Sequence, residues 1–500
     1  MTTKPNIVVI MTDQQRADVS KREGFQLDTT PFLDSLATQG AWFDRAYTTM
    51  PACLPARVSM LTGRYPSATH ARTNHNGKDA FFETDLYEVM RQQGYRTALC
   101  GKNHSYLDAD QMDYYFPLGH HGGLGENRTD DEIAFDEYLA NLRMRADSDP
   151  APYSVEVQCP FRAVTAATNW IDGIRGDGEP DPDPFFLWLS FPEPHNPYQA
   201  PEPYFSMFPP ETLPATLSDQ SALEVKGFKY QWLRHIGEMG FPDYAEQLPR
   251  ARSNYMGMLR LIDDQIKRFF EYLDVKNLRD NTIVIFLSDH GDYVGEYGLM
   301  RKGAELPEVL IRIPFLFVGP DILVSDKPHP AHITTADVMP TICEAIGVDI
   351  PRGVQGRSLW ALLTGKEYPE EEFDSAYSEH GFGGLHYTAD DDFDPESDGL
   401  HPTIGFDELN GWSQSGTMRA IRKGDWKLIF DMQEHGQLYN LAEDPVELND
   451  LFDHPDYAAI QSKMLAALLG WTLRVQDPLP HPRRRYKFKS DKQNYWSPYR

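Results

Sequence analysis

Cysteine is scarce in this sequence. Only four cysteines (Cys53, Cys100, Cys159 and Cys343) occur among 500 residues, and no two of them form a CxxC pair. Four widely spaced thiols are too few to be the disulfide framework of a chain of this length, which excludes the small disulfide-stabilised secreted folds. We therefore expect a protein of a reducing compartment.

Long apolar segments are missing as well. The N-terminal stretch MTTKPNIVVIMTDQQ contains one short apolar run, which has neither the length of a signal peptide nor a small-residue cleavage site. No other run approaches the roughly 18 apolar residues of a membrane-spanning helix. We expect a soluble, cytoplasmic protein with no membrane partner.

Positive charge is in deficit. The chain has 47 lysines and arginines against 75 aspartates and glutamates, a formal net charge of −28. This balance disfavours nucleic acid or an anionic membrane as the main partner. An anionic substrate would require a local cationic pocket within the negative field.

Short β-rich apolar runs are abundant, and segments with helical periodicity separate them. This alternation predicts an α/β fold with a large mixed, mostly parallel sheet covered by helices on both faces. Proline in the first turn and glycine after the last turn mark several of the helices. The predicted strands cover residues 7–11, 97–100, 185–189, 283–287 and 315–318.

The composition changes near residue 374. The segment at about 388–412 is acidic, rich in glycine and proline and without periodicity, which is typical of a long loop or lid. We predict a catalytic domain over residues 1–373 and a smaller α+β subdomain over 374–500. The basic, aromatic tail at 480–500 is expected to be disordered or to dock on a neighbouring subunit of a homo-oligomer.

Polar side chains follow four of the predicted strands. In an open α/β sheet, ligands bind beyond the carboxyl ends of the strands, so these distant segments should converge on one site. The alternatives are a strand-end salt bridge for the second group and a rigid loop between prolines for the third. The residues are Asp13 and Gln14, then Lys102 and His104, then His195, and finally Asp289 and His290.

The first and last of these groups predict a metal site. Asp13, Gln14, Asp289 and His290 offer carboxylate, amide and imidazole ligands, an oxygen-rich set that suits a hard divalent cation such as Ca²⁺ or Mg²⁺. The imidazole leaves Mn²⁺ and Zn²⁺ open. Taken alone, Asp13 could instead be a helix cap or a turn residue.

Cys53 lies in the stretch PACLPARVSMLTGRYP, at the predicted start of a helix. Pro55 suits a first helical turn, where free backbone N–H groups and the helix dipole favour negative charge. Arg57, one turn later, offers a guanidinium fork for an oxyanion. A lone cysteine here would be an inert buried thiol, but the proline and arginine at this spacing favour a nucleophile.

The stretch CLPARVSMLTGR resembles the signature of the sulfatase family, Cys-x-Pro-x-Arg followed by Leu-Thr-Gly-Arg. The stretch GYRTALCGKNH resembles the second signature of the family, and the similarity extends from NIVVIMTDQQ through FLSDHGDYVGEYGLMRKG to LYNLAEDPVELNDL. The resemblance implies a formylglycine-dependent (type I) sulfatase with an alkaline-phosphatase-like fold. In that family the cysteine is oxidised to formylglycine, an aldehyde whose hydrate is the nucleophile.

The resemblance also implies roles for single residues. The modified Cys53 would join the four metal ligands around one divalent ion, with Ca²⁺ preferred and Mn²⁺ or Mg²⁺ as alternatives. Arg57, Lys102 and Lys302 would neutralise the sulfuryl oxygens. His195 with Lys302 would stabilise or protonate the departing oxygen, and His104 would accept a proton as sulfate is released. Without the family, Lys302 could be an exposed lysine.

The substrate implied is a small sulfate ester, such as a sulfated sugar or an aryl sulfate, and a formylglycine-generating maturation enzyme is implied as a partner. Asn74, otherwise a turn residue, is a candidate contact to the sulfate group. The lid-like segment supplies further candidates for the leaving-group pocket, namely His380, His386 and Trp412.

Two other functions compete with this one. A phosphonate monoester or phosphodiester hydrolase on the same framework would act on a similar tetrahedral group, but those relatives replace the lysine and histidine of the second signature, which are present here as Lys102 and His104. A non-catalytic anion-binding protein would lack a nucleophile, a metal ligand or a cationic residue, and none of these is missing.

Overall fold

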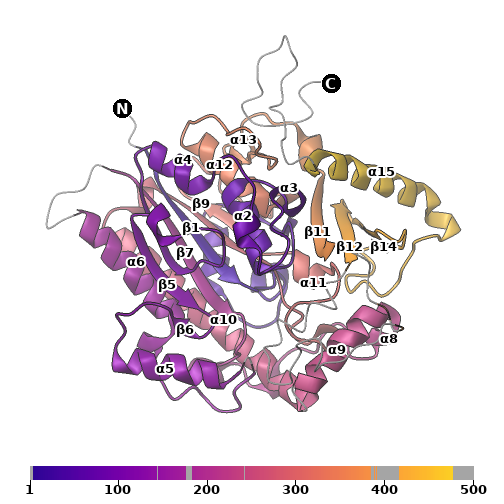
Figure 1. Ribbon diagram of the computed structural model, residues 1–500, viewed down its shortest axis with the longest axis horizontal. Coiled ribbons are helices and arrows are strands. Elements are labelled where there is room, and N and C mark those ends of the chain that lie inside the picture. Colours follow the sequence, from indigo (N-terminus) through magenta and orange to yellow (C-terminus); the bar gives the residue numbers. More distant parts are fainter. Residues whose placement is uncertain are drawn as a thin grey trace, which may run out of the picture.

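A mostly parallel sheet of eight strands forms the centre of the molecule (Figure 1). The computed structural model describes residues 4–143, 145–175, 183–240, 243–383, 388, 390 and 416–476. Five neighbouring strands run parallel, whereas β9 and β6 pair antiparallel with their neighbours. The order across the sheet is β2 (Ala41–Phe43), β9 (Phe315–Val318), β8 (Thr282–Ser288), β1 (Asn6–Asp13), β7 (Phe185–Pro194), β4 (Arg96–Lys102), β5 (Tyr114–Gly119) and β6 (Gly122–Gly123). The predicted mixed, mostly parallel sheet is confirmed.

Helices cover both faces of the large sheet. Alternate residues of β1 belong to two separate apolar clusters: Ile7, Val9 and Met11 to one, Val8 and Ile10 to the other. A strand covered on both faces has to be apolar at nearly every position, which explains the continuous run that the sequence shows. The first face carries α2 (Cys53–Thr62), α4 (Leu86–Gln92), α12 (Val338–Ala345) and α13 (Trp360–Leu363); the second carries α1 (Pro31–Ala37), α5 (Asp130–Asn141), α6 (Cys159–Arg175) and α10 (Tyr244–Val275).

A third apolar cluster supports the loop that follows β8. The loop side chains Tyr293, Tyr297 and Met300 are buried there against α9 and the beginning of α10. This packing anchors the segment that leads to Lys302. The smaller elements nearby are α7 (Tyr204–Met207), α8 (Ala222–Lys226), α9 (Phe228–Gly240) and α11 (Glu308–Ile311).

The C-terminal part contains a four-stranded antiparallel sheet with one long helix (Figure 1, orange to yellow). In β12, Ile421 packs toward α15, whereas Met418 and Ala420 pack toward Tyr47 and Ile311 of the large part. The predicted combination of strands and helix in this part is confirmed. The elements are β11 (Ser375–Gly383), β12 (Gly416–Lys423), β13 (Trp426–Asp431), β14 (Gly436–Asn440) and α15 (Ala458–Val475).

Two predicted segments lie outside the described residues. They are most of the lid-like segment (388–412) and the whole tail (480–500). Within the described chain, no helix combines the length and apolar character that crossing a bilayer requires. The short elements are β3 (Ala46–Tyr47), which pairs with β10 (Ile333–Thr334), and α3 (Pro66–Thr69).

Candidate active site

The candidate nucleophile is the first residue of a buried helix. α2 begins at Cys53, and Asn74 Oδ1 accepts a hydrogen bond from the backbone N–H of Leu54 (3.1 Å). The thiol therefore lies at the positive end of the helix dipole. Its sulfur is 3.2 Å from His290 Nε2 and 3.5 Å from Asp13 Oδ1. These contacts join the start of α2 to the carboxyl ends of β8 and β1.

Four side chains form a group that could hold one metal ion. Asp13, Cys53, Asp289 and His290 are all buried, and their ligand atoms lie within 4.8 Å of one another; no second such group of histidine, cysteine and carboxylate side chains occurs among the described residues. Bonds of about 2.3–2.6 Å to a cation separate opposite ligands by up to about 5 Å. The group therefore fits around a single divalent cation.

Backbone contacts fix the orientation of two of these ligands. His290 Nδ1 lies 2.9 Å from the carbonyl oxygen of Gly291. A carbonyl oxygen only accepts hydrogen bonds, so Nδ1 carries a proton, and Nε2 is the ring nitrogen that faces the cluster. Asp289 Oδ1 accepts hydrogen bonds from the backbone N–H groups of Gln14 (3.0 Å) and His290 (2.9 Å).

Arg57 lies against the carboxylates of the cluster. Its guanidinium donates to Asp289 Oδ2 (2.9 Å), Asp13 Oδ2 (3.2 Å), Ser190 Oγ (2.8 Å) and the carbonyl oxygen of Lys102 (2.9 Å), and it is fully buried. From the sequence, the Arg57 guanidinium was predicted to bind an oxyanion. In the structure the guanidinium faces the two carboxylates, whose negative charge it balances and whose orientation it fixes.

Gln14 adopts an unusual backbone conformation next to Asp13. Its φ is +70°, and Tyr255 Oη donates to its carbonyl oxygen (2.8 Å). Its side-chain Nε2 donates to Asp292 Oδ2 (2.6 Å), and its Oε1 accepts from Lys302 Nζ (3.1 Å). Strained residues of this kind persist only where neighbours hold them. Tyr255 and Asp292 hold this one.

Two lysines and two histidines form the cationic side of the site. Lys102 Nζ is paired with Asp13 and lies 2.8 Å from His120 Nε2. Lys302 Nζ lies 3.1 Å from His195 Nε2. The rings of His120 and His195 are stacked, with centroids 3.7 Å apart. Lys102 thus forms an ion pair at the strand end, with Asp13 and not with His104. The exposed position considered for Lys302 is wrong, because its side chain is fully buried.

The charges around Cys53 change its acidity. Burial and the Asp13 carboxylate raise the pKa of the Cys53 thiol, but the positive charges of Lys102, Lys302 and His290 outweigh them and lower the pKa to about 5. An unmodified thiol would thus be largely ionised at neutral pH. The same field favours any anionic group that enters the site.

The pKa of His195 is lowered as well, which favours its neutral form. Burial, and after it the ammonium of Lys302, lower the pKa of His195 well below its usual range. Its Nδ1 lies 2.8 Å from the carbonyl oxygen of Asn196, so this nitrogen carries the proton of the neutral ring. Nε2 then accepts from Lys302.

His104 and Asn74 lie side by side next to the start of α2. His104 Nε2 is 3.1 Å from the carbonyl oxygen of Asn74, so Nε2 is the protonated nitrogen. His104 Nδ1 is buried and has no hydrogen-bond partner among the described residues. Asn74, predicted as a sulfate contact or a turn residue, uses its side-chain oxygen to cap α2 at Leu54.

Of the remaining predicted substrate contacts, the structure describes His380. His380 is on β11, 2% exposed, and opposite Met418 of β12. Its neighbour Glu379 accepts hydrogen bonds from Ser67 (2.9 and 2.6 Å), which places this end of β11 against α3. His386 and Trp412 lie outside the described residues.

Three residues of the site were not predicted from the sequence: His120, Tyr255 and Asp292. Asp292 belongs to the quoted stretch FLSDHGDYVG, and its spacing of three residues from Asp289 was the available signal. His120 is in the turn between β5 and β6, and Tyr255 is in the middle of α10. Only the tertiary structure brings these two to the strand ends.

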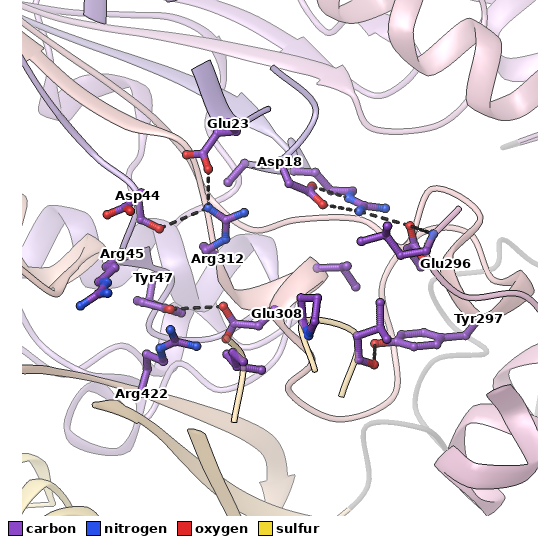
Figure 2. Close-up of a pocket in the computed structure, with 17 residues that line it drawn as sticks. Asp18, Glu23, Asp44, Arg45, Tyr47, Glu296, Tyr297, Glu308, Arg312 and Arg422 are labelled. Atoms are coloured by element: carbon purple, nitrogen blue, oxygen red, sulfur yellow. Dashed lines mark hydrogen bonds and ion pairs between the residues drawn. The ribbon is translucent and has the colours of Figure 1, made fainter. Parts of the chain in front are cut away.

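A cavity of about 320 Å³ lies elsewhere, between the large part and the C-terminal sheet (Figure 2). Its lining includes Arg16 but none of the four residues of the metal-binding group. Arg312 is paired with Glu23 (2.8 Å), and Arg16 with Asp18 (2.6 Å). Because opposite charges neutralise one another here, the cavity lacks the excess positive charge that an anionic substrate requires.

Comparison with known proteins agrees with this geometry. A family model described as Sulfatase matches residues 5–348. An arylsulfatase of Clostridium perfringens (strain 13 / Type A) is 29% identical over 479 residues, covering 91% of each chain. A choline-sulfatase of Rhizobium meliloti (strain 1021) is 25% identical and covers 93% of this chain and 86% of its own.

A solved structure shares the fold. The crystal structure of a phosphonate monoester hydrolase of Agrobacterium radiobacter superposes with a TM-score of 0.76 at 24% identity, covering 95% of this chain and 97% of that one. The likeness at this identity concerns the fold.

Proposed function

This chain belongs to the sulfatase family, and on that basis we propose that it hydrolyses a small sulfate monoester to an alcohol and sulfate. The observation that carries the proposal is the position of Cys53. The thiol begins α2 and touches two members of a buried group that fits a divalent cation. A cysteine with only a packing role would have apolar neighbours.

The proposal requires two groups that the chain acquires. Asp13, Asp289, His290 and Gln14 would hold a divalent cation. A formylglycine in place of Cys53 would supply the nucleophilic oxygen, which such a cation would polarise. The chain itself balances the charge of this group through Arg57, which binds both carboxylates. We take Ca²⁺ as the resident ion, with Mn²⁺ or Mg²⁺ as alternatives, because most of the donors are hard oxygens.

The chain's own residues would bind the sulfuryl group and assist the leaving group. Lys102 uses two of its three N–H donors on Asp13 and His120, and we assign the third to a sulfuryl oxygen. The Lys302 ammonium, whose direction His195 Nε2 sets, would stabilise the departing alcohol oxygen. Nδ1 of His104 would accept the proton that is released when sulfate leaves.

The substrate is proposed at the level of a chemical class. We expect a sulfated sugar or an aryl sulfate, in line with the name of the arylsulfatase relative. The choline-sulfatase relative makes a cationic alkyl sulfate a necessary member of any substrate panel.

A phosphonate monoester hydrolase remains the competing function. The structural likeness to such an enzyme concerns the fold. Lys102 and His104 favour a sulfate ester as the substrate. The family resemblance implies that phosphonate hydrolases have uncharged hydroxyl residues at these two positions. Comparing kcat/KM for an aryl sulfate with that for the matching aryl phosphonate decides between the two. A preference for the phosphonate would reverse the proposal.

The nucleophile can be tested directly by mass spectrometry. Trypsin releases residues 46–57 as one peptide containing Cys53. We expect protein from its native host to show loss of the thiol and gain of an aldehyde that a hydrazide traps. An unmodified thiol in fully active protein would contradict the formylglycine mechanism. In the same preparation, chelation should abolish turnover and one added divalent ion should restore it.

A further inference from the structure

We propose that His120 is a positioning residue for sulfate ester cleavage, which joins the sulfate-binding lysine, Lys102, to the leaving-group pair of His195 and Lys302. This inference rests on the proposed function. It concerns a residue outside both sulfatase signatures, in the turn between β5 and β6. No motif of the sequence indicated it.

Two contacts of different kinds carry the inference. His120 Nε2 lies 2.8 Å from Lys102 Nζ, within hydrogen-bond distance. The face of the same ring stacks on His195, with centroids 3.7 Å apart and an interplanar angle of 24°. One side chain therefore touches both halves of the cationic group.

The local sequence explains how the ring reaches this place. Gly122 has a φ of +89°, and a β-carbon there would collide with the Asp136 carboxylate. Arg162 and Arg128 hold that carboxylate at 2.7 and 2.9 Å. The tight turn after Gly119 thus packs on a fixed ion-pair group, and this packing holds His120 over the end of β4.

The direction of the hydrogen bonds follows from the donors available. A lysine ammonium only donates, so both imidazoles accept at Nε2 and are neutral while both lysines are charged. Two imidazolium rings at the stacking distance would repel each other. The arrangement is therefore a symmetrical row, Lys102 donating to His120 and Lys302 donating to His195, with the two neutral rings stacked in the middle.

This row predicts two separable functions for one side chain. The acceptor at Nε2 keeps the Lys102 ammonium against the sulfuryl oxygens, which are charged in the ground state and the transition state alike. The stacked face keeps His195, and through it Lys302, aligned with the leaving oxygen, whose charge grows only in the transition state. Loss of the Nε2 acceptor should raise KM. Loss of the stacked ring should lower kcat for substrates with poor leaving groups.

Two substitutions separate the functions. His120→Phe keeps an aromatic face for His195 but removes the acceptor, whereas His120→Gln keeps an acceptor but removes the stacked ring. The same two changes at His121, the adjacent and exposed histidine of the turn, are the matched controls. Each variant is assayed as the matured, metal-loaded enzyme, with formylglycine content and melting temperature measured in parallel.

For His120→Phe we expect KM for aryl sulfates and the inhibition constant of inorganic sulfate to rise about tenfold, with kcat nearly unchanged. For His120→Gln we expect KM to change little. Its kcat should fall about 100-fold for an alkyl or sugar sulfate but only a few-fold for a nitrophenyl sulfate, because a good leaving group needs little stabilisation. A residue that only supports folding would lower all rates by one common factor.

The inference is overturned if the two variants lose activity equally on all substrates, or if neither differs from the His121 controls. A measurement on the unaltered protein guards against variants that do not fold. With ¹⁵N-labelled histidine, NMR should show His120 and His195 as neutral rings protonated at Nδ1, and a doubly protonated His120 would contradict the row. If the wild-type enzyme cleaves no sulfate ester, the proposed function fails, and the NMR result together with calorimetry of inorganic sulfate binding still decides the role of His120.

Discussion

At the scale of single residues, the site depends on charges that neutralise each other without solvent. Asp13 is fully buried, yet it faces Arg57, Lys102 and His290, and Asp289 shares the guanidinium of Arg57. Removing one member of such a group leaves another charge buried and unpaired. The ligands and their cationic neighbours therefore act as one unit, and the residues that orient them matter almost as much as the ligands.

Asp292 provides a test of this dependence. Its carboxylate accepts hydrogen bonds from Gln14 Nε2 (2.6 Å) and Tyr198 Oη (2.7 Å). Asp292→Asn should let the Gln14 amide turn and weaken metal binding about 10–100-fold. Titration of activity against free metal concentration measures the change. Asp326→Asn, at an exposed aspartate, serves as the control, and equal metal affinity in both variants would show that Asp292 does not orient a ligand.

At the scale of secondary-structure elements, the strand ends can converge only because the strands pack closely there. Gly101 of β4 is opposite Ser190 of β7, immediately before Lys102. Its φ is +120°, and a β-carbon at this position would collide with the carbonyl oxygen of Ser190. Close packing of these two strands sets the distance between Lys102 and the Ser190 hydroxyl that binds Arg57.

Gly101→Ala should separate the two strands at the site. We expect the free energy of unfolding to fall by about 2–4 kcal/mol and turnover to decrease strongly, since Lys102 moves with the strand. Gly173→Ala is the control: it lies in α6, has open space around it, and should stabilise the helix by about 0.5–1 kcal/mol. Chemical denaturation and activity assays measure both. Unchanged stability of Gly101→Ala would mean that the close approach is not needed.

A buried aspartate makes the start of α1 sensitive to pH. Asp263 accepts hydrogen bonds from the backbone N–H groups of Phe32 and Leu33 (2.8 Å each). Burial outweighs these contacts and raises the pKa of Asp263 to about 7. Between about pH 4, where an unfolded aspartate titrates, and pH 7 the folded state retains the proton and the unfolded state does not. Asp263 therefore reduces stability as the pH rises through this window, by at most about 1.4 kcal/mol per pH unit.

The variant Asp263→Asn should lose this dependence. We expect the stability difference between variant and wild type to shift in favour of the variant from pH 4 to pH 7 and to be constant above it. Urea denaturation at several pH values measures the difference, and Asp280→Asn, at an exposed aspartate, is the control. A difference that does not change with pH would show that Asp263 is ionised in the folded protein throughout.

At the scale of the whole molecule, a buried ion pair joins the C-terminal sheet to the large part. Lys427 of β13 lies 2.7 Å from Glu447 and 3.1 Å from Glu308 at the start of α11, and its side chain is fully buried. Next to this contact, Tyr47 Oη donates to Glu308 (3.2 Å), and Tyr47 belongs to an apolar cluster that includes Ile311 and Met418. The C-terminal sheet is therefore part of the framework that fixes the region around α11.

Lys427→Met should destabilise the molecule by about 3–5 kcal/mol, because two carboxylates would be left buried without a partner. Lys423→Met, at a lysine paired with Asp374 on the surface, should cost less than about 1 kcal/mol. Thermal and chemical unfolding measure both. Equal stability of the two variants would show that water reaches Glu308 and Glu447 once Lys427 is gone.

The parallel sheet, the family and the residues of the two signatures could all be predicted from the order of the amino acids alone. Strands buried on both faces must be apolar at nearly every position, so β1, β4, β7 and β8 were visible as continuous runs. Chemistry at strand ends follows from the topology of such sheets, which is why Asp13 and Asp289 could be assigned to one site in advance.

The way in which the charged groups face one another depends on how the chain folds. The fold turned the fork of Arg57 toward Asp13 and Asp289, gave Asn74 the cap of α2 and brought His120 between Lys102 and His195. Side-chain direction depends on packing between segments that are far apart in the chain, and no local pattern records it. The sequence therefore determines which groups the site contains, whereas the fold decides which of them act on each other.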